Sequence, residues 1–305
     1  MSRTSSPPPT KRARHDSVSQ SGQPPNGGAI KIDALPPLSL SILGVEPLDE
    51  FIKEIADFVH HMIMTRPDMA GSKVEVEAKI GVVRERTTGQ RLALPVLVET
   101  ILVPDLDIRF ESNMAASQHK HFNVLLNELR SSQMHSATPL SYQHLYLVDS
   151  FYPCEGNDRE KVRVTRDETN GKVMECMRKI RLGDLNVYSP KRSADWRVSV
   201  NLEVPVSHPI GSASHTRRKD RMSYAHEEFV IDLTQVSSTT TPNAPVQVSH
   251  ELEIEIARSD LLLATALKRG APNASEYERS AFDELIRAFV NNARILVRNA
   301  LDTWH

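Results

Sequence analysis

Charged and apolar residues alternate along many short segments of this chain, and this two-residue period restricts the possible folds more than any other feature. Successive side chains of a β-strand point to opposite faces, so each segment would carry one charged and one apolar face. Glutamates hold the charged positions in KVEVEAKIG (Glu75, Glu77) and in HELEIEIA (Glu251, Glu253, Glu255). Carboxylates brought together on neighbouring strands repel one another unless a divalent cation or basic side chains lie among them.

The same period recurs with mostly basic residues between the two glutamate segments. For a single strand, the ordinary interpretation is a sheet with one face in water. So many strands carrying both kinds of residue favour a barrel with a charged lumen and an apolar outside. The residues expected in the lumen, besides the five glutamates already named, are Lys161, Arg163, Thr165, Lys179, Arg181, Arg197, Ser199, Asn201, Glu203, Lys219, Arg221, Asp232 and Thr234.

The amino-terminal residues differ in composition from the rest. Residues 1–36 are rich in Ser, Pro, Gly, Lys and Arg and poor in apolar side chains, so burial cannot offset the entropy lost on ordering. We expect a disordered tail over 1–36 and one domain over 37–305. A basic cluster in the tail, Lys11, Arg12 and Arg14, is equally compatible with a nuclear address and with a solubilising group.

Helical and strand periods divide the domain. Apolar residues at 3.6-residue spacing predict helices from Phe51 to about Arg66, over 115–129 and over 275–297, the last with a capping-box pair at Ser275 and Glu278. We expect these helices to cover the apolar outside of the barrel, and polar spans 206–217 and 236–247 to be surface loops. The predicted strands lie near 73–82, 95–103, 108–112, 142–152, 160–166, 173–183, 194–205, 220–232 and 248–257.

Composition and missing motifs exclude several functions. The formal net charge of −2 gives no bulk attraction to nucleic acid, and the two cysteines, Cys154 and Cys176, lack zinc-type spacing and are too few for a disulfide framework. There is no GxxxxGK[ST] phosphate loop, GxSxG elbow or HExxH motif. Without a signal peptide or 18 consecutive apolar residues, we expect neither secretion nor a membrane span.

The residue types of the predicted lumen suit a phosphate-rich substrate bound with a metal. Carboxylates two residues apart on one strand, joined by one from another strand, give oxygen-only ligands of the kind Mg²⁺ or Mn²⁺ prefers. Arginine and lysine side chains across the lumen can bind phosphate oxygens. Phosphoryl transfer depends mainly on positioning and charge neutralisation, so the pattern predicts chemistry on a nucleotide or polyphosphate.

The motifs, taken in order, resemble the fungal mRNA-capping RNA 5′-triphosphatases, the β-subunits of the yeast-type capping apparatus. They are KVEVEAKIG, RFES, KVRVT, RKIR with NVYSP, DWRVSVNLEV, RKDRMSY, FVIDLTQV and HELEIEI, within about residues 37–300. The ExExK motif alone is shared by the wider triphosphate tunnel superfamily, whereas the ordered set is specific. The resemblance implies an α+β fold with an eight-stranded antiparallel tunnel and helices outside it.

The resemblance also implies a function and partners. The chain would be a homodimeric nuclear enzyme that removes the γ-phosphate from nascent mRNA with Mg²⁺ or Mn²⁺. Its partners would be the guanylyltransferase, which is the capping α-subunit, and/or the C-terminal domain of RNA polymerase II. No Trp-rich peptide precedes the domain, so the mode of recruitment stays open.

Residue roles follow from the resemblance, position by position. Glu75, Glu77 and Glu255 would bind the metal, and Arg163, Lys219 and Arg221 would form the clamp for the γ-phosphate. Glu203 would orient the attacking water. Further basic positions of the tunnel would be Lys179 and Arg197, essential floor carboxylates Glu251 and Glu253, and braces of the basic side chains Asp232 and Thr234.

Two positions depart from the family pattern. Val230 stands where relatives carry an arginine, and Ile80 stands where an aromatic residue is usual. We expect the first change to leave Asp232 without its neighbour, with Arg178 or Arg218 as possible substitutes. Two other functions stay open: a tunnel enzyme acting on tripolyphosphate or free nucleoside triphosphate, and a non-catalytic scaffold. The scaffold is disfavoured because five clustered glutamates repel one another and so lower stability, and a protein without catalytic activity would not need them.

Overall fold

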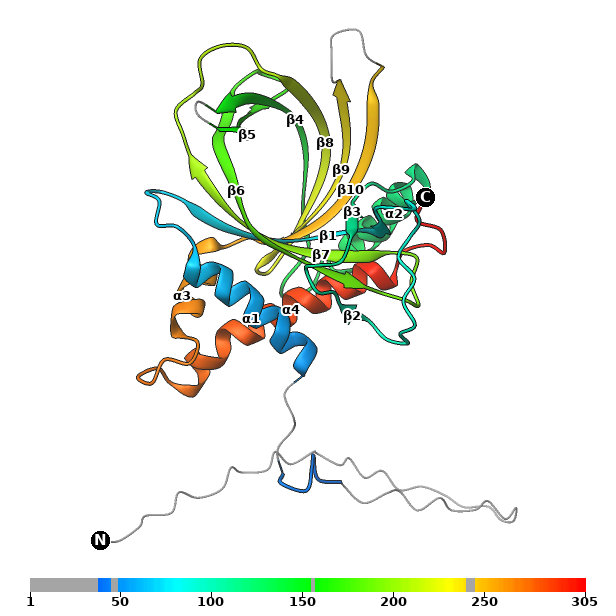
Figure 1. Ribbon diagram of the computed structural model, residues 1–305, viewed down its shortest axis with the longest axis vertical. Helices are drawn as coiled ribbons and strands as arrows, with labels where there is room; N and C mark the ends of the chain where they lie inside the picture. Colours follow the sequence, from blue (N-terminus) through cyan, green and yellow to red (C-terminus); the bar gives the residue numbers. More distant parts are fainter. Residues whose placement is uncertain (1–37, 45–48, 155–156, 240–244) are drawn as a thin grey trace. The chain divides into compact units, whose positions relative to one another are not determined.

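Eight long strands close into an antiparallel barrel (Figure 1). Around the barrel each strand pairs with the next in the order β1–β7–β6–β5–β4–β8–β9–β10, and β10 pairs with β1 to complete the circuit. This confirms the predicted closed eight-stranded barrel. The wall strands are β1 (Lys73–Glu85), β4 (Ser141–Cys154), β5 (Asn157–Asp167), β6 (Val173–Tyr188), β7 (Asp195–Pro205), β8 (His215–His226), β9 (Phe229–Thr239) and β10 (Gln247–Ile256).

The computed structural model describes residues 38–44, 49–154, 157–239 and 245–305. The chain divides into two units, Met1–Pro47 and Leu48–His305. In the first unit, the described residues 38–44 include the exposed side chains of Leu38, Leu40, Ile42 and Leu43. The predicted tail, residues 1–36, lies outside the described residues.

Three helices lie under one side of the barrel (Figure 1): α1 (Glu50–Thr65), α3 (Ser259–Lys268) and α4 (Glu276–Arg298). They pack on the outer faces of β1, β7 and β10, whose inner faces we call the floor. Val76, Val200 and Ile254 are fully buried there against helical residues such as Phe289. The alternating residues therefore face as predicted: the apolar ones point outwards and are covered by the helices, and the charged ones point into the barrel.

The helix ends follow the expected local chemistry. Asp49 caps α1 by accepting from the amides of Phe51 and Ile52, and the predicted capping box of Ser275 and Glu278 opens α4. The helix expected over 115–129 is α2 (Ala116–Ser132), which packs against β9 and β10. No helix among the described residues is long and apolar enough to cross a bilayer.

Glycine permits one close approach of helix to wall. A Cβ on Gly183 of β6 would lie 2.9 Å from Met62 Sδ and 3.2 Å from Phe58 Cε2, both on α1. A β-bulge falls between Arg181 and Gly183, at the same point of the strand. The bulge and the missing side chain together let α1 pack directly on the β6 backbone.

The structure corrects several predicted elements. The single strand expected over 220–232 is wrong, because β8 and β9 form a hairpin that turns at Glu227 with a positive φ of 52°. The predicted loops 206–217 and 236–247 are each partly strand. The strand expected over 95–103 is reduced to β2 (Thr100–Ile101), which pairs with β6, while β3 (Ile108–Glu111) extends the β1 edge. Helix α3 was not predicted.

Candidate active site

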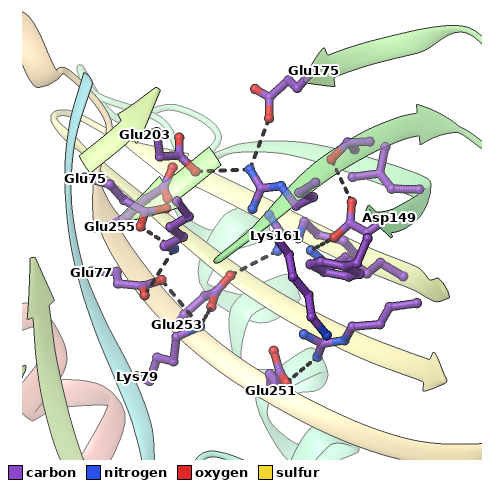
Figure 2. Close-up of a pocket in the computed structure, with 18 of the residues that line it drawn as sticks. Glu75, Glu77, Lys79, Asp149, Lys161, Glu175, Glu203, Glu251, Glu253 and Glu255 are labelled. Carbon is purple, nitrogen blue, oxygen red and sulfur yellow. Dashed lines mark hydrogen bonds and ion pairs between the residues drawn. The ribbon is translucent and has the colours of Figure 1, made fainter. Parts of the chain in front are cut away.

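The barrel encloses a cavity of about 600 Å³ whose walls are almost entirely charged (Figure 2). Glutamates of the floor face basic residues from β5, β6 and β8 across it. The structure thus brings together most of the residues expected in the lumen. Those predicted site residues that line the cavity are Glu75, Glu77, Arg163, Lys179, Glu203, Lys219, Arg221, Glu251, Glu253 and Glu255.

The floor glutamates meet at the strand pair that closes the barrel. Glu77 and Glu255 are register partners on β1 and β10, and Glu75 lies two residues away on the same face. Asn201 of β7 donates to Glu75 Oε2 at 2.9 Å and to Glu77 Oε1 at 3.3 Å. The ammonium of Lys179 contacts Glu75 and lies 3.5 Å from Glu77. Two carboxylates of β1 are therefore held side by side by one amide and one cation, with Glu255 of β10 opposite Glu77 in the register.

Glu255 has an unusual electrostatic environment. Its burial, together with the nearby carboxylates of Asp232, Glu75 and Glu253, raises its pKa from 4.5 to about 8, against a lowering by Arg221. Val230, its register partner on β9, supplies no charge. The cations around the floor therefore do not offset the burial of Glu255 and its three acidic neighbours, and the neutral form of its carboxyl group is favoured.

The three residues expected to form the clamp, Arg163, Lys219 and Arg221, are each held by an acidic or hydroxyl partner. Arg163 Nη2 lies 3.0 Å from Glu203 Oε1 and 3.4 Å from Glu175 Oε2. Lys219 Nζ lies 2.5 Å from Asp149 Oδ2, and Thr165 donates to the other Asp149 oxygen at 2.7 Å. These bonds fix where the positive charges lie before a substrate enters.

Arg221, the third clamp residue, is braced by the residues expected for that role. Its Nη1 lies 2.5 Å from Asp232 Oδ2, its Nε donates to Thr234 Oγ1 at 3.1 Å, and its Nη2 lies 3.0 Å from Glu253 Oε1. Neither Asp232 nor Thr234 lines the cavity, and both contact Arg221, which does.

The expectation that Val230 leaves Asp232 without a neighbour is wrong, since Arg221 is that neighbour. The suggested substitutes lie elsewhere. Arg178 pairs with Glu160 at 3.3 Å, and Arg218 pairs with Glu168. What the valine changes is the charge opposite Glu255.

Comparison with known proteins shows which family this chain belongs to. A family model described as mRNA capping enzyme, beta chain, matches residues 45–302. This chain belongs to that family. The mRNA-capping enzyme subunit beta of Schizosaccharomyces pombe is 37% identical over 273 residues, covering 87% of this chain and 86% of the relative. That of Cryptococcus neoformans is 37% identical over 271 residues, covering 86% of this chain and 65% of the relative.

A solved structure of a family member has the same fold. The S. pombe Pct1 RNA triphosphatase superposes with a TM-score of 0.77 at 35% identity, covering 88% of this chain and 100% of that one. The same relative has been solved in complex with the Spt5 CTD. Family membership confirms the predicted enzyme class, an RNA 5′-triphosphatase, and removes the support for a non-catalytic scaffold.

The floor of this capping β chain fits the metal dependence that is general in its family. All three proposed ligands, Glu75, Glu77 and Glu255, offer only carboxylate oxygens, and the high pKa of Glu255 marks a place that needs positive charge. In this conformation the described residues present no group of three such ligands arranged for an ion. The ammonium of Lys179 supplies positive charge to Glu75 and Glu77 instead.

Five residues expected in the lumen do not line the cavity: Arg197, Ser199, Asn201, Asp232 and Thr234. Asn201 and Thr234 still contact residues of the lining, whereas Arg197 is held by residues outside it. The Nε of Arg197 donates to Asn186 Oδ1 at 2.8 Å, and its Nη1 lies 3.3 Å from Asp184 Oδ2. Its guanidinium also lies 4.8 Å from the centre of the Phe110 ring. The side chain points to the inner face as expected, but it lies near the start of β7, where β3 adjoins β1.

Several lumen residues were missed. Lys79, which lies 2.6 Å from Glu253, continues the Glu75–Glu77 alternation, so the signal was present in the sequence. Arg217, 2.9 Å from Glu251, fell in a span assigned to a loop. Asp149 stands alone in the apolar run LYLVDSF and gave no such signal.

Proposed function

We propose that this capping β chain removes the γ-phosphate from the 5′-triphosphate end of nascent mRNA inside the barrel, leaving a diphosphate end. The observation that carries the proposal is the opposition of the floor glutamates to Arg163, Lys219 and Arg221 across one cavity. A triphosphate is a compact polyanion, and a water-filled lumen lined by fixed positive charges binds it without a dedicated loop.

The clamp would bind the γ-phosphate and neutralise the charge that grows on it as water attacks in line. Glu203 Oε1, positioned by its bond from Arg163 Nη2, would accept a hydrogen bond from that water and orient it. The bond from phosphorus to the bridging oxygen breaks, and orthophosphate and the RNA diphosphate leave. Lys179, Glu251 and Glu253 would act through charge balance, and Asp232 and Thr234 through Arg221.

Glu75, Glu77 and Glu255 would hold the divalent metal. When bound, Mg²⁺ or Mn²⁺ supplies Lewis-acid polarisation of the phosphate oxygens. The support for this ligand set is its oxygen-only chemistry on neighbouring strands, together with the raised pKa of Glu255, which a nearby divalent cation would lower. Titration of the protein with each ion measures which of the two metals it prefers.

Nuclear location, dimerisation and partners belong to the same proposal. The basic cluster Lys11, Arg12 and Arg14 supports a nuclear address, and nascent mRNA is made in the nucleus. We expect a homodimer that acts with the guanylyltransferase and/or the C-terminal domain of RNA polymerase II. The complex of the S. pombe relative with the Spt5 CTD supports recruitment through the transcription machinery.

Phosphate release from γ-labelled triphosphate-ended RNA tests the proposal. The full chain should release orthophosphate only with Mg²⁺ or Mn²⁺, and Glu75→Ala or Glu255→Ala should abolish release while the circular dichroism spectrum stays unchanged. Glu54→Ala, an exposed glutamate on α1, is the matched control. Near-normal release by either lumen variant would overturn the metal assignment. A wild-type protein that hydrolyses tripolyphosphate or free nucleoside triphosphate but not RNA would transfer the function to that substrate.

A further inference from the structure

Two parallel rings lie on the wall of the otherwise charged cavity. Phe151 of β4 and His215 of β8 are register partners, and their ring centroids are 4.4 Å apart with the planes 3° from parallel. Among the described residues that line the cavity, they are the only two with rings. A triphosphate has no ring that could stack on an aromatic side chain, so the pair points to a part of the substrate beyond the phosphates.

The ring pair lies at the ends of its strands. His215 is the first residue of β8, and Phe151 is three residues from the end of β4 at Cys154. Lys219 of the clamp is four residues further along β8, which corresponds to about 13 Å along a strand. Arg163, which belongs to the same proposed clamp, is the register partner of Phe151, so the rings adjoin one end of the clamp and Lys219 lies towards the other. A triphosphate with its γ-phosphate near Lys219 would place its nucleotide at the end of the clamp that carries the rings.

The two rings are fixed in place and suited to stacking. Ser214 Oγ donates to the Phe151 carbonyl oxygen at 3.0 Å and lies 3.0 Å from His215 Nδ1, which ties the two strands together behind the rings. Burial and the cations Lys161 and Arg217 lower the pKa of His215, so the imidazole is neutral at physiological pH. A neutral ring beside a phenyl ring presents an uncharged aromatic surface.

A cation lies beside the rings. Lys161, the register partner of Pro153, lines the cavity, and Figure 2 shows its side chain extending into the lumen. Within the described part of the chain it forms no ion pair, unlike the clamp lysine, Lys219. A lysine with no acidic partner among the described side chains, next to an aromatic pair, resembles the arrangement by which proteins hold single-stranded nucleic acid, with the base on a ring and the phosphate on a cation.

We propose that the Phe151–His215 pair stacks against the base of the 5′-terminal nucleotide, with Lys161 contacting its backbone phosphate, so that this end of the cavity selects RNA ends over inorganic polyphosphate. The inference rests on the proposed function. It assigns a binding site to the 5′-terminal base, which the charged residues of the lumen do not bind. Every base has a π-face, so the contact accepts transcripts that begin with any base.

The test compares two triphosphate-ended RNAs that differ only in the presence of the first base. With the wild-type protein, removing the base should raise KM about 10-fold at similar kcat, within the range measured for base stacking on aromatic side chains. Phe151→Leu should show the higher KM with the intact RNA, and base removal should then have no further effect. Tyr146→Leu is the control, because Tyr146 stacks on His144 on the same strand but does not line the cavity.

An equal rise in KM on base removal in the wild type and in Phe151→Leu would overturn the proposal, as would no rise in the wild type. If Phe151→Leu fails to fold, His215→Leu takes its place, and the wild-type comparison of the two RNAs decides by itself. Failure of the proposed function is distinct, because then the wild type would release no phosphate from either RNA.

Discussion

Lys79 Nζ lies 2.6 Å from Glu253 Oε2, across the strand pair β1–β10 that closes the barrel. The same ammonium lies 3.4 Å from Glu77 Oε2. Burial opposes its charge, but Glu253, Glu77 and Glu251 outweigh burial and raise the pKa of Lys79. One cation thus offsets three carboxylates at the seam of the floor.

Replacing that cation should weaken the fold. Lys79→Met removes the cation shared by Glu77 and Glu253 and leaves only Lys179 beside the first and Arg221 beside the second, so we expect a loss of about 2–3 kcal/mol in the free energy of unfolding. This is below the usual cost of a broken buried pair because a quarter of the Lys79 side chain is exposed. Urea unfolding measures it. Lys53→Met, which breaks an exposed pair with Asp57 on α1, should change stability far less; equal losses in both variants would contradict the seam interpretation.

Asp149 should act as a positioning residue for Lys219. Asp149→Asn keeps the shape but removes the charge, so Lys219 loses its anchor and kcat should fall about 10- to 100-fold. Burial lowers the pKa of Lys219 and Asp149 raises it, so the alkaline limb of the pH–rate profile should move to lower pH in this variant. A lower rate with an unchanged profile would indicate a merely structural role. Asp220→Asn, one residue from Lys219 and paired with His144 away from the cavity, should leave both quantities unchanged.

Asp195 should be a major determinant of stability. Its carboxylate is fully buried, accepts from the amides of Val83 and Ser189 at 2.9 Å each, and binds Arg91 through both oxygens. Asp195→Ala leaves these donors unpaired, and we expect a loss of about 3–5 kcal/mol by thermal or urea unfolding. Asp107→Ala, which removes an exposed pair, should stay within about 0.5 kcal/mol. A small effect at Asp195 would mean that water replaces the carboxylate.

The ring pair of His119 and His250, with centroids 4.7 Å apart, should make the protein sensitive to acid. Burial and His250 lower the pKa of His119 from 6.5 to about 4, while Asp220 opposes this weakly. The folded state therefore binds fewer protons than the unfolded chain between these values, and stability falls as pH falls from about 6.5 to 4.

His119→Phe keeps the ring and removes the titration, so about 1 kcal/mol of that acid-induced loss should disappear, allowing for the water that reaches this half-buried site. Urea unfolding at pH 7 and pH 5 gives the comparison, with His61→Phe on the exposed face of α1 as control. An unchanged difference between the two pH values in His119→Phe would assign the acid sensitivity to other groups.

The alternation in the sequence predicted which residues line the barrel, because the apolar face of each strand has to be buried and the charged face is then left to point into the lumen. Val76 and Ile254 had to be buried, so Glu77 and Glu255 had to face the lumen. The same rule placed Lys179 and Lys219, and it could also have placed Lys79. The number of antiparallel strands, eight, was expected from the family resemblance. Their order around the barrel was not predicted, because alternation does not encode which strands pair.

Other features left no mark in the sequence. The turn between β8 and β9 uses Glu227 at a positive φ, a conformation usually taken by glycine or asparagine, so no turn residue separated the two strands. Helix α3 begins after Arg258 without a capping side chain and is only ten residues long. The displacement of Arg197 from the cavity depends on its place along the barrel axis, which a two-residue period does not contain.

The strand pair β1–β10 joins Glu77 to Glu255, and it is made by the first and the last strands of the barrel. On the ribosome, β1 emerges long before its partner, and until β10 is synthesised it has neither its neighbour on that side nor the carboxylates that complete the floor. Such distant pairing slows folding and leaves strand edges open while the chain grows. The enzyme therefore gains its active site only after β10 has emerged and the barrel has closed.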